Sequence, residues 1–467
     1  MSHQFHPTVL REYDIRGIIG ETLGPDDARA IGRCFATLLR EAGGSKVAVG
    51  HDGRVSSPIL EHALVEGLTA SGCDVVRIGM AATPMLYYAE ASAEEVHGGI
   101  QITGSHNPAN YNGFKMVFQG RPFFGADIQR LGRMAAEGAW RDGTGEVERR
   151  EVMDAYIDRL LAGLDGVDHA ALGGLRVGWD AGNGAAGPAL EALTARLPGE
   201  HHLLYTDVDG DFPNHHPDPT VEANLADLKA LVAEKNLDFG VAFDGDGDRI
   251  GAIDGEGRVI WGDQLLMIYA EDLLARQPGA TVIADVKASR ALFDHVAAHG
   301  GQPVMWKTGH SLIKSKMKQT GAPLAGEMSG HVFFADDYYG FDDALYAGVR
   351  LIAASARLGK SVTELRTAMP AMINTPEMRF QVDESRKFAA IDEVAARLTD
   401  SPARVDATDG VRVTTDDGWW LLRASNTQDV LVARAESTSE AGLERLMAQI
   451  DEQLALSDLE RGEQAGH

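Results

Sequence analysis

Hydrophobic and polar positions along this chain fall into repeated blocks that predict α/β units. Three β-branched apolar runs each open a block, and each is followed by a Gly-rich polar turn and then by a stretch with helical periodicity. These runs are residues 47–50, 177–179 and 282–284. Because the order strand, turn, amphipathic helix is typical of parallel α/β units, the pattern predicts mainly parallel sheets covered by helices.

Each block continues with a second strand that ends in a distinctive loop. The loops are residues 103–108 (Thr-Gly-Ser-His-Asn-Pro), 244–249 (Asp-Gly-Asp-Gly-Asp-Arg) and 326–331 (Gly-Glu-Met-Ser-Gly-His). The recurrence indicates one structural unit used three times. Because ligands of open α/β sheets bind beyond the carboxyl ends of the strands, we expect the three loops to face a common cleft.

After Pro370 and Pro376 the pattern changes to shorter strands that end in a polar run at residues 423–427. The length of 467 residues is appropriate for three or four domains. We therefore predict an α/β protein of three similar α/β domains with mixed, mainly parallel sheets and a smaller C-terminal α+β domain around a central cleft. The predicted limits are 1–150, 151–256, 257–369 and 370–467.

Composition and charge narrow the function classes. The chain is 44% hydrophobic and 24% charged, as in soluble globular proteins, and no apolar stretch is long enough for a spanning helix. The first residues show no export signal, so we expect a cytoplasmic protein. Cys34 and Cys73 belong to no metal pattern and are expected to be buried. The net charge of −26 argues against nucleic acid, so an anionic substrate would require a local group of Arg and Lys.

The triple-aspartate loop predicts a divalent metal site. Asp244, Asp246 and Asp248 alternate with glycines after the apolar run 239–243. Their carboxylates would repel one another without a cation, and a set of oxygen ligands favours Mg²⁺ and phosphate chemistry. A solvated acidic turn or a calcium loop is the alternative. An EF-hand is disfavoured because Arg249 and Gly255 occupy its sixth and twelfth positions.

Ser105 is the candidate nucleophile. It lies between Gly104 and His106-Asn107-Pro108, directly after the strand at residues 98–102. A serine hydroxyl needs a base or a metal to become reactive, and a metal at the aspartates could polarise a phosphoryl group on its oxygen. A turn serine that bonds to its own backbone is the alternative.

Together, the four loops resemble the α-D-phosphohexomutase superfamily, in particular its bacterial phosphomannomutase/phosphoglucomutase branch, from about residue 13 to about residue 434. The resemblance implies that Ser105 carries a phosphoryl group and that Asp244, Asp246 and Asp248 hold Mg²⁺ with it. It also implies that the phosphoserine donates to mannose or glucose 1- or 6-phosphate. A hexose 1,6-bisphosphate, intermediate and activator, then turns around before the other phosphate returns to the serine.

The resemblance also implies roles for the residues around these loops. Lys115 and Arg249 are expected to neutralise the moving phosphoryl group, and Arg16 to face the cleft. Candidates for the general acid or base are His106, His331 and a Lys115 of lowered pKa. The implied substrate contacts are Tyr13, Asn107, Lys287, His310, Glu327, Ser329, Arg423, Ser425, Asn426 and Thr427.

Several alternatives remain open at this level. Arg16 could form only a surface salt bridge, and His310 could be structural. Asp429, where the family often has Pro, could loosen the phosphate loop, the loop beginning at residues 423–427 that the resemblance implies holds the non-reacting phosphate. A Mg²⁺-dependent sugar phosphatase or a sugar-phosphate sensor could share some motifs. Phosphoglucosamine mutases usually carry Gln where Met328 stands, which favours mannose and glucose phosphates. We further expect a monomer or weak dimer and a hinge near residues 368–378.

Overall fold

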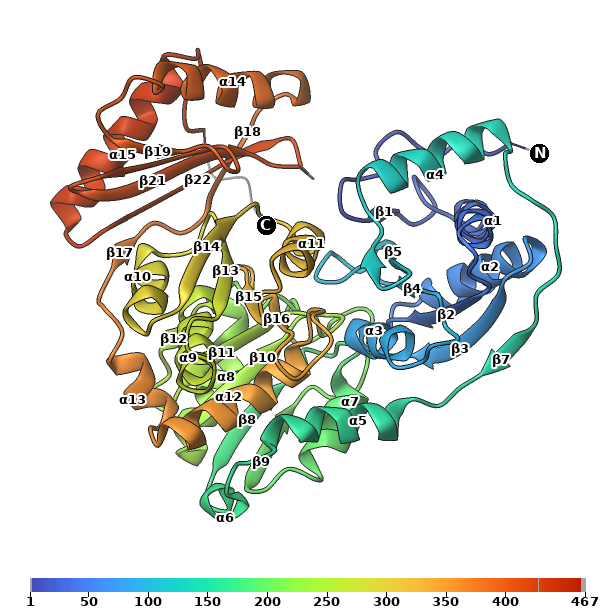
Figure 1. Ribbon diagram of the computed structural model, residues 1–467, viewed down its shortest axis with the longest axis horizontal. Coiled ribbons are helices and arrows are strands. Elements are labelled where there is room, and N and C mark those ends of the chain that lie inside the picture. Colours follow the sequence, from blue (N-terminus) through green and yellow to red (C-terminus); the bar gives the residue numbers. More distant parts are fainter. Residues whose placement is uncertain (1, 427, 463–467) are drawn as a thin grey trace.

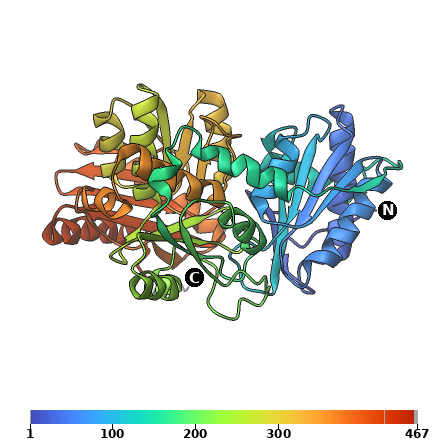
Figure 2. The same ribbon diagram turned by 90° about the horizontal axis from the view of Figure 1, so that it is seen from below.

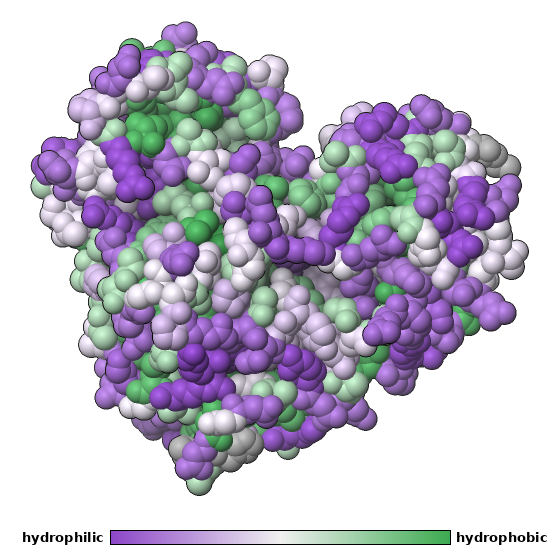
Figure 3. All heavy atoms as spheres, in the orientation of Figure 1, coloured by the Kyte–Doolittle hydropathy of each residue, from purple (hydrophilic) through white to green (hydrophobic). Residues whose placement is uncertain are grey.

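The computed structural model describes residues 2–426 and 428–462 and confirms three α/β domains and a smaller C-terminal α+β domain. In Figure 1 the fourth domain lies at the upper left above the third domain, and the first domain lies at the right beside the second and third. Seen from below, the first domain lies to one side of the other three (Figure 2). The molecular surface is hollowed between the first and fourth domains (Figure 3). This hollow is where the predicted cleft opens.

The first domain contains a seven-stranded sheet in the order β1-β5-β4-β2-β3-β7, with β6 paired to β5. Its strands are β1 (Ile15–Ile18), β2 (Lys46–His51), β3 (Asp74–Met80), β4 (Gly98–Ile102), β5 (Tyr111–Phe118), β6 (Arg121–Pro122) and β7 (Val147–Arg149). Its helices are α1 (Pro25–Glu41), α2 (Ser57–Ala70), α3 (Thr83–Ala91) and α4 (Ala126–Glu137).

The second domain has the sheet order β12-β11-β10-β8-β9. Its elements are α5 (Met153–Leu161), η1 (Ala162–Leu164), α6 (His169–Leu172), β8 (Arg176–Asp180), α7 (Gly187–Thr194), β9 (Glu200–Leu204), η2 (Glu222–Leu225), α8 (Ala226–Lys235), β10 (Phe239–Phe243), β11 (Ile250–Asp254) and β12 (Val259–Ile260).

The third domain has the order β14-β13-β15-β16. Its elements are α9 (Gly262–Arg276), β13 (Thr281–Asp285), α10 (Arg290–Ala298), β14 (Gln302–Trp306), α11 (His310–Thr320), β15 (Leu324–Gly326), β16 (Val332–Phe334), α12 (Ala344–Leu358) and α13 (Val362–Thr367).

The three sheets share one topology, which confirms the repeated unit. In each, the first apolar strand (β2, β8 or β13) pairs in parallel with a strand on either side. One of these neighbours (β4, β10 or β15) then turns back into an antiparallel strand. The three motif loops are those turns. They therefore emerge beyond the carboxyl ends of parallel strands, where ligands of such sheets bind.

The fourth domain is a meander packed against two helices. Its sheet order is β17-β22-β21-β20-β19, with β18 paired to β22. The elements are β17 (Ile373–Asn374), β18 (Met378–Gln381), α14 (Glu384–Arg397), β19 (Arg404–Asp406), β20 (Val411–Thr415), β21 (Gly418–Ala424), β22 (Val430–Ser437) and α15 (Glu440–Ala455). The predicted phosphate loop connects β21 to β22.

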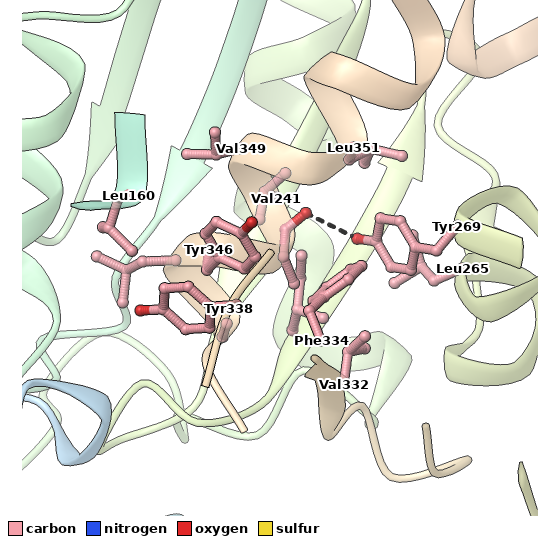
Figure 4. Packing of buried hydrophobic residues seen from close by; sticks show 14 of the residues in the cluster. Leu160, Val241, Leu265, Tyr269, Val332, Phe334, Tyr338, Tyr346, Val349 and Leu351 are labelled. Atoms are coloured by element: carbon pink, nitrogen blue, oxygen red, sulfur yellow. Dashed lines mark hydrogen bonds between the residues drawn. The ribbon is translucent and has the colours of Figure 1, made fainter. Parts of the chain in front are cut away.

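One hydrophobic core runs through the second and third domains and also includes residues of the first domain, such as Leu86 and Tyr87 of α3, whereas separate clusters fill the rest of the first domain and the fourth domain. The shared core contains Trp179, stacked on Phe243, and Tyr338, stacked on Tyr346. In the same cluster Tyr269 donates a hydrogen bond to the carbonyl of Ala347 across the helix pair (Figure 4). Burying this much apolar surface in common makes the two middle domains a rigid base.

Both cysteines are buried free thiols, as expected. Among the described residues, no helix combines the length and hydrophobicity needed to cross a membrane.

Candidate functional site

A cleft of about 740 Å³ is lined by residues from all four domains. Its lining contains more Arg and Lys than Asp and Glu although the protein as a whole is acidic, and this matches the expectation for an anionic substrate. The predicted site residues that line it are Tyr13, Arg16, Ser105, His106, Asn107, Lys115, Arg249, Lys287, His310, Glu327, Ser329, His331, Arg423, Ser425 and Asn426. Thr427 lies outside the described residues.

Ser105 is held at the bottom of the cleft, against the metal loop of the next domain. Its side chain is almost fully buried, and its φ of 50° is unusual for a residue other than glycine. Its hydroxyl donates to Oδ2 of Asp244 at 2.8 Å and lies 3.2 Å from Nδ1 of His106. The fold therefore brings together two motifs that are far apart in sequence.

The fold uses one residue that sequence reasoning missed, Arg54, to hold the serine loop. Its buried guanidinium donates to the carbonyls of Ser105, Asn107 and Pro108 at 2.6 to 2.8 Å. It is itself held by Asp52, whose carboxylate also accepts from the N–H of Gly104 at 3.0 Å. The only sequence signal was its place in His51-Asp52-Gly53-Arg54, the turn after the first strand of the block.

Replacing Arg54 with lysine is expected to lower kcat by about 10- to 100-fold with little change in KM. An ammonium cannot reach three carbonyls in a fixed fork, so the loop would lose its exact position. Steady-state kinetics and amide hydrogen exchange over residues 103–110 would measure this, with faster exchange expected in the variant. An unchanged kcat in a variant with faster exchange would show that the loop does not need this positioning.

The three aspartates are buried and form the predicted oxygen cradle. One ligand oxygen from each lies within 4.8 Å of the other two. Oδ1 of Asp246 and Oδ1 of Asp248 have no hydrogen-bond partner within the described part of the chain. Lys115 contacts both residues, with its Nζ 2.7 Å from Oδ2 of Asp246. Unpaired buried carboxylate oxygens are costly, so the donor set fits a hard divalent cation such as Mg²⁺.

The electrostatics of this cradle overturn one expectation. Burial and the neighbouring Asp246 and Asp248 raise the pKa of Asp244 well above its ordinary value. The carboxylates also raise the pKa of Lys115, outweighing its burial. The prediction of a lowered pKa for Lys115 is therefore wrong, and Lys115 acts here as a fixed cation.

Two histidines remain as proton-transfer candidates. Burial and nearby cations lower the pKa of His106 well below its ordinary value, which keeps it neutral. His331 accepts a hydrogen bond at Nε2 from Arg249 at 3.0 Å, and its Nδ1 lies 3.0 Å from Oδ2 of Asp342. Asp342, which was not foreseen, thus faces the ring on the side away from Arg249. His310 stacks on His331 with ring centroids 5.4 Å apart.

The loop at residues 326–331 is fixed by hydrogen bonds to other segments of the third domain. Glu327 accepts from the N–H of Gly309 at 2.7 Å, and the N–H of Met328 donates to Asp285 at 3.2 Å. Burial raises the pKa of Asp285 to about 6. Asp285 ends the first strand of its block, just as Asp52 follows the first strand of the first domain, and both bind a motif loop through its backbone.

The predicted phosphate loop meets the other domains through Tyr13. The Tyr13 hydroxyl accepts from Asn426 Nδ2 at 2.7 Å and donates to the carbonyl of Thr308 at 2.9 Å, so it joins the first, third and fourth domains. Asp429 points outward, and Lys387 holds the loop by donating to the carbonyl of Gln428 at 3.0 Å.

Arg423, expected to contact substrate, and Arg16, expected to face the cleft, are each paired with one carboxylate. Arg423 lies 3.0 Å from Asp409, and Arg16 lies 2.5 Å from Asp14. Both pairs line or border the cleft and leave guanidinium nitrogens for a ligand.

Comparisons with known proteins agree with this geometry. Models of phosphoglucomutase/phosphomannomutase α/β/α domains I, II and III match residues 7–141, 154–257 and 261–372, and the model of the C-terminal domain matches residues 377–453. The chain is 44% identical over 451 residues to the phosphomannomutase/phosphoglucomutase of Pseudomonas aeruginosa, covering 97% of this chain and 96% of that protein. It is 43% identical to the phosphoglucomutase of Neisseria gonorrhoeae over 444 residues, 94% of this chain and 95% of that protein.

A solved structure shows the same arrangement. The crystal structure of a phosphoglucomutase/phosphomannomutase family protein from Burkholderia thailandensis superposes with a TM-score of 0.91 at 43% identity. The match covers 97% of this chain and 98% of that one.

Proposed function

The chain belongs to the phosphoglucomutase/phosphomannomutase family, and on that premise we propose that it interconverts the 1- and 6-phosphates of mannose and of glucose through a phosphoryl group on Ser105. The observation that carries the proposal is the 2.8 Å contact between the Ser105 hydroxyl and Asp244 at the floor of the cleft. It places a nucleophilic oxygen directly beside an oxygen cradle suited to Mg²⁺.

We assign Mg²⁺ binding to Asp244, Asp246 and Asp248, with Ser105 as the fourth ligand. When bound, the ion supplies positive charge against the oxygens of the transferring phosphoryl group. Lys115 and Arg249 add fixed cations on the cleft side of this cradle. In phosphoryl transfer most of the catalysis is positioning and charge neutralisation, which is what this group of side chains supplies.

We assign proton transfer to a histidine. The sugar hydroxyl that attacks the phosphoserine must lose a proton, and the serine oxygen that is released must gain one. His331 is held between Arg249 and Asp342 with Nε2 as the acceptor nitrogen. His106, neutral and 3.2 Å from the Ser105 hydroxyl, is the second candidate for the same role.

The remaining loops suit a substrate that binds in two orientations. Glu327 and Ser329 offer hydroxyl-binding oxygens on the sugar side of the cleft. Arg423, Ser425 and Asn426 form a separate phosphate-binding group on the fourth domain, and Tyr13, Asn107, Lys287, His310 and Arg16 line the space between. A second phosphate-binding group is needed to retain a bisphosphate intermediate, whereas a phosphatase has no such need.

The experiment that tests this function is a coupled assay on mannose 1-phosphate and glucose 1-phosphate, with Mg²⁺ and a trace of glucose 1,6-bisphosphate as activator. Conversion of both to 6-phosphates without release of inorganic phosphate supports the dual mutase. Glucosamine 1-phosphate is the matched control substrate. Its faster conversion would reassign the chain as a phosphoglucosamine mutase, and release of inorganic phosphate would reassign it as a phosphatase.

We also propose that the protein is cytoplasmic, that it is a monomer or a weak dimer, and that its four domains have the limits given above.

Turnover is expected to involve a swing of the fourth domain about residues 368–378. Lys287 of the third domain pairs with Glu377 at 2.9 Å, and a small apolar cluster of Val286, Trp419 and Leu421 joins the two domains nearby. Because this apolar contact is small, the fourth domain can move to close over a substrate. Small-angle scattering with and without glucose 1-phosphate should show a smaller radius of gyration in the bound state. Identical fourth-domain positions in free and substrate-bound crystals would refute the hinge.

A further inference from the structure

A second group of metal-binding side chains lies on the third domain, away from the cleft. Glu271 of α9 and His295 of α10 are partly buried, and His299, which caps α10, is exposed. One ligand atom from each lies within 4.8 Å of the other two. Both helices lie on the side of the third domain that faces away from the first domain (Figure 1). The mutase chemistry proposed above uses none of these three residues.

The hydrogen bonds of the two histidines leave nitrogens free for a metal. Nδ1 of His299 lies 2.9 Å from the carbonyl of His295, and since a carbonyl only accepts, Nδ1 carries the proton and Nε2 has a free lone pair. Nε2 of His295 is buried with no hydrogen-bond partner among the described residues. Holding one ring nitrogen to a backbone carbonyl is how metal-binding histidines are commonly oriented.

The carboxylate completes the set. Oε2 of Glu271 lies 3.6 Å from Nε2 of His295, while Oε1 is held by Lys360 at 3.0 Å. Ligands around a tetrahedral zinc ion, at about 2.0 to 2.2 Å from the metal, are separated by about 3.3 Å. The Glu271–His295 pair is therefore already near the required spacing.

From this geometry we propose that Glu271, His295 and His299 form a transition-metal site, with Zn²⁺ as its preferred physiological ion and water at the open position. Two nitrogens and one oxygen suit zinc, whereas the all-oxygen aspartate cradle suits Mg²⁺. The chain thus has two cation sites that differ in chemical preference.

Such a site would link α9 to the carboxyl end of α10. The amino end of α10 lies at the boundary with the fourth domain, where the N–H of Arg290 donates to Glu436 at 3.0 Å. A metal at the other end would fix the helix that contacts the fourth domain. Its effect would be on stability, since phosphoryl transfer occurs elsewhere.

The test uses the full chain without a histidine tag, stripped by chelator and then saturated with Mg²⁺ so that the aspartate cradle is occupied. Equilibrium dialysis against Zn²⁺ should give one bound equivalent in the wild type. In His299→Ala the affinity for that equivalent should fall by about tenfold or more. Zinc should also raise the thermal midpoint of the wild type in a concentration-dependent way, and this shift should be lost in the variant.

A histidine–glutamate pair on α2 provides the matched control. His62 and Glu66 are also four residues apart on a helix and 3.2 Å apart, but the described residues offer them no third ligand. His62→Ala should bind zinc like the wild type, and all three proteins should have equal mutase activity in Mg²⁺. Absence of the zinc equivalent, or its full retention in His299→Ala, would overturn the proposal.

Discussion

Replacing Ser105 with alanine is expected to lower the interconversion of hexose 1- and 6-phosphates by about 10⁴-fold or more. The serine oxygen is the atom that receives and returns the phosphoryl group. Among the described residues, two hydroxyls donate to the aspartate cradle: that of Ser105, to Asp244, and that of Thr83, to Asp246. Alanine keeps the same Cβ, so the unusual backbone at this position gains no new strain. Coupled assays in both directions would measure the loss.

The control for this variant is Ser315→Ala. Ser315 is a helical serine whose hydroxyl donates to the carbonyl of Ser311 at 2.9 Å and which does not line the cleft. It should keep wild-type activity. If Ser105→Ala turned over hexose phosphates at a rate within tenfold of the wild type, the phosphoserine mechanism would be wrong.

The second large effect is expected for Asp244→Asn, which should weaken Mg²⁺ binding and lower kcat by about 10²- to 10³-fold. Oδ1 of Asp244 accepts from the N–H groups of Gly247, Asp248 and Arg249, each at 3.1 Å, and an amide oxygen can keep these bonds. The loop should therefore retain its shape. What is lost is one negative charge from the set that binds the ion.

The same change should stabilise the metal-free protein. Three buried carboxylates are balanced by few cations, and the raised pKa of Asp244 reflects that repulsion. Removing one charge relieves it, so the thermal midpoint in EDTA should rise while activity falls. Asn224→Asp, a charge change in η2 outside the cleft, is a control that should affect neither Mg²⁺ affinity nor kcat. A lower midpoint in EDTA for Asp244→Asn would show that the carboxylate is structural.

Local sequence patterns were enough to predict the repeated α/β unit and the position of its loops. Strand periodicity and Gly-rich turns act over a few residues, so the hairpin loops at 103–108, 244–249 and 326–331 could be placed at strand ends. Their convergence on one cleft followed from the general rule for parallel sheets.

The residues that sequence reasoning missed act over long distances in the chain. Arg54 holds a loop that lies about fifty residues further on, and Asp342 contacts a histidine in another loop. No spacing rule predicts such pairs. The direction of the Lys115 pKa was mispredicted for the same reason, because it depends on carboxylates from the neighbouring domain.

The shared core of the second and third domains was equally hidden from the sequence. An amphipathic helix such as α12 shows which face is apolar but not which domain will cover that face. In the structure α12 packs on Trp179 of the second domain, where a Cβ added at Gly348 would lie 2.9 Å from the indole. The close approach of helix and ring depends on that glycine.

The most direct test of the phosphoserine mechanism follows the phosphoryl group itself. The chain would be labelled with ³²P from glucose 1,6-bisphosphate, the labelled residue located by peptide mapping, and the labelled protein chased with unlabelled mannose 1-phosphate. The phosphoserine mechanism predicts label on Ser105 that passes into hexose bisphosphate and then into the hexose 6-phosphate pool. Label on another residue, or label released from Ser105 as inorganic phosphate, would contradict it.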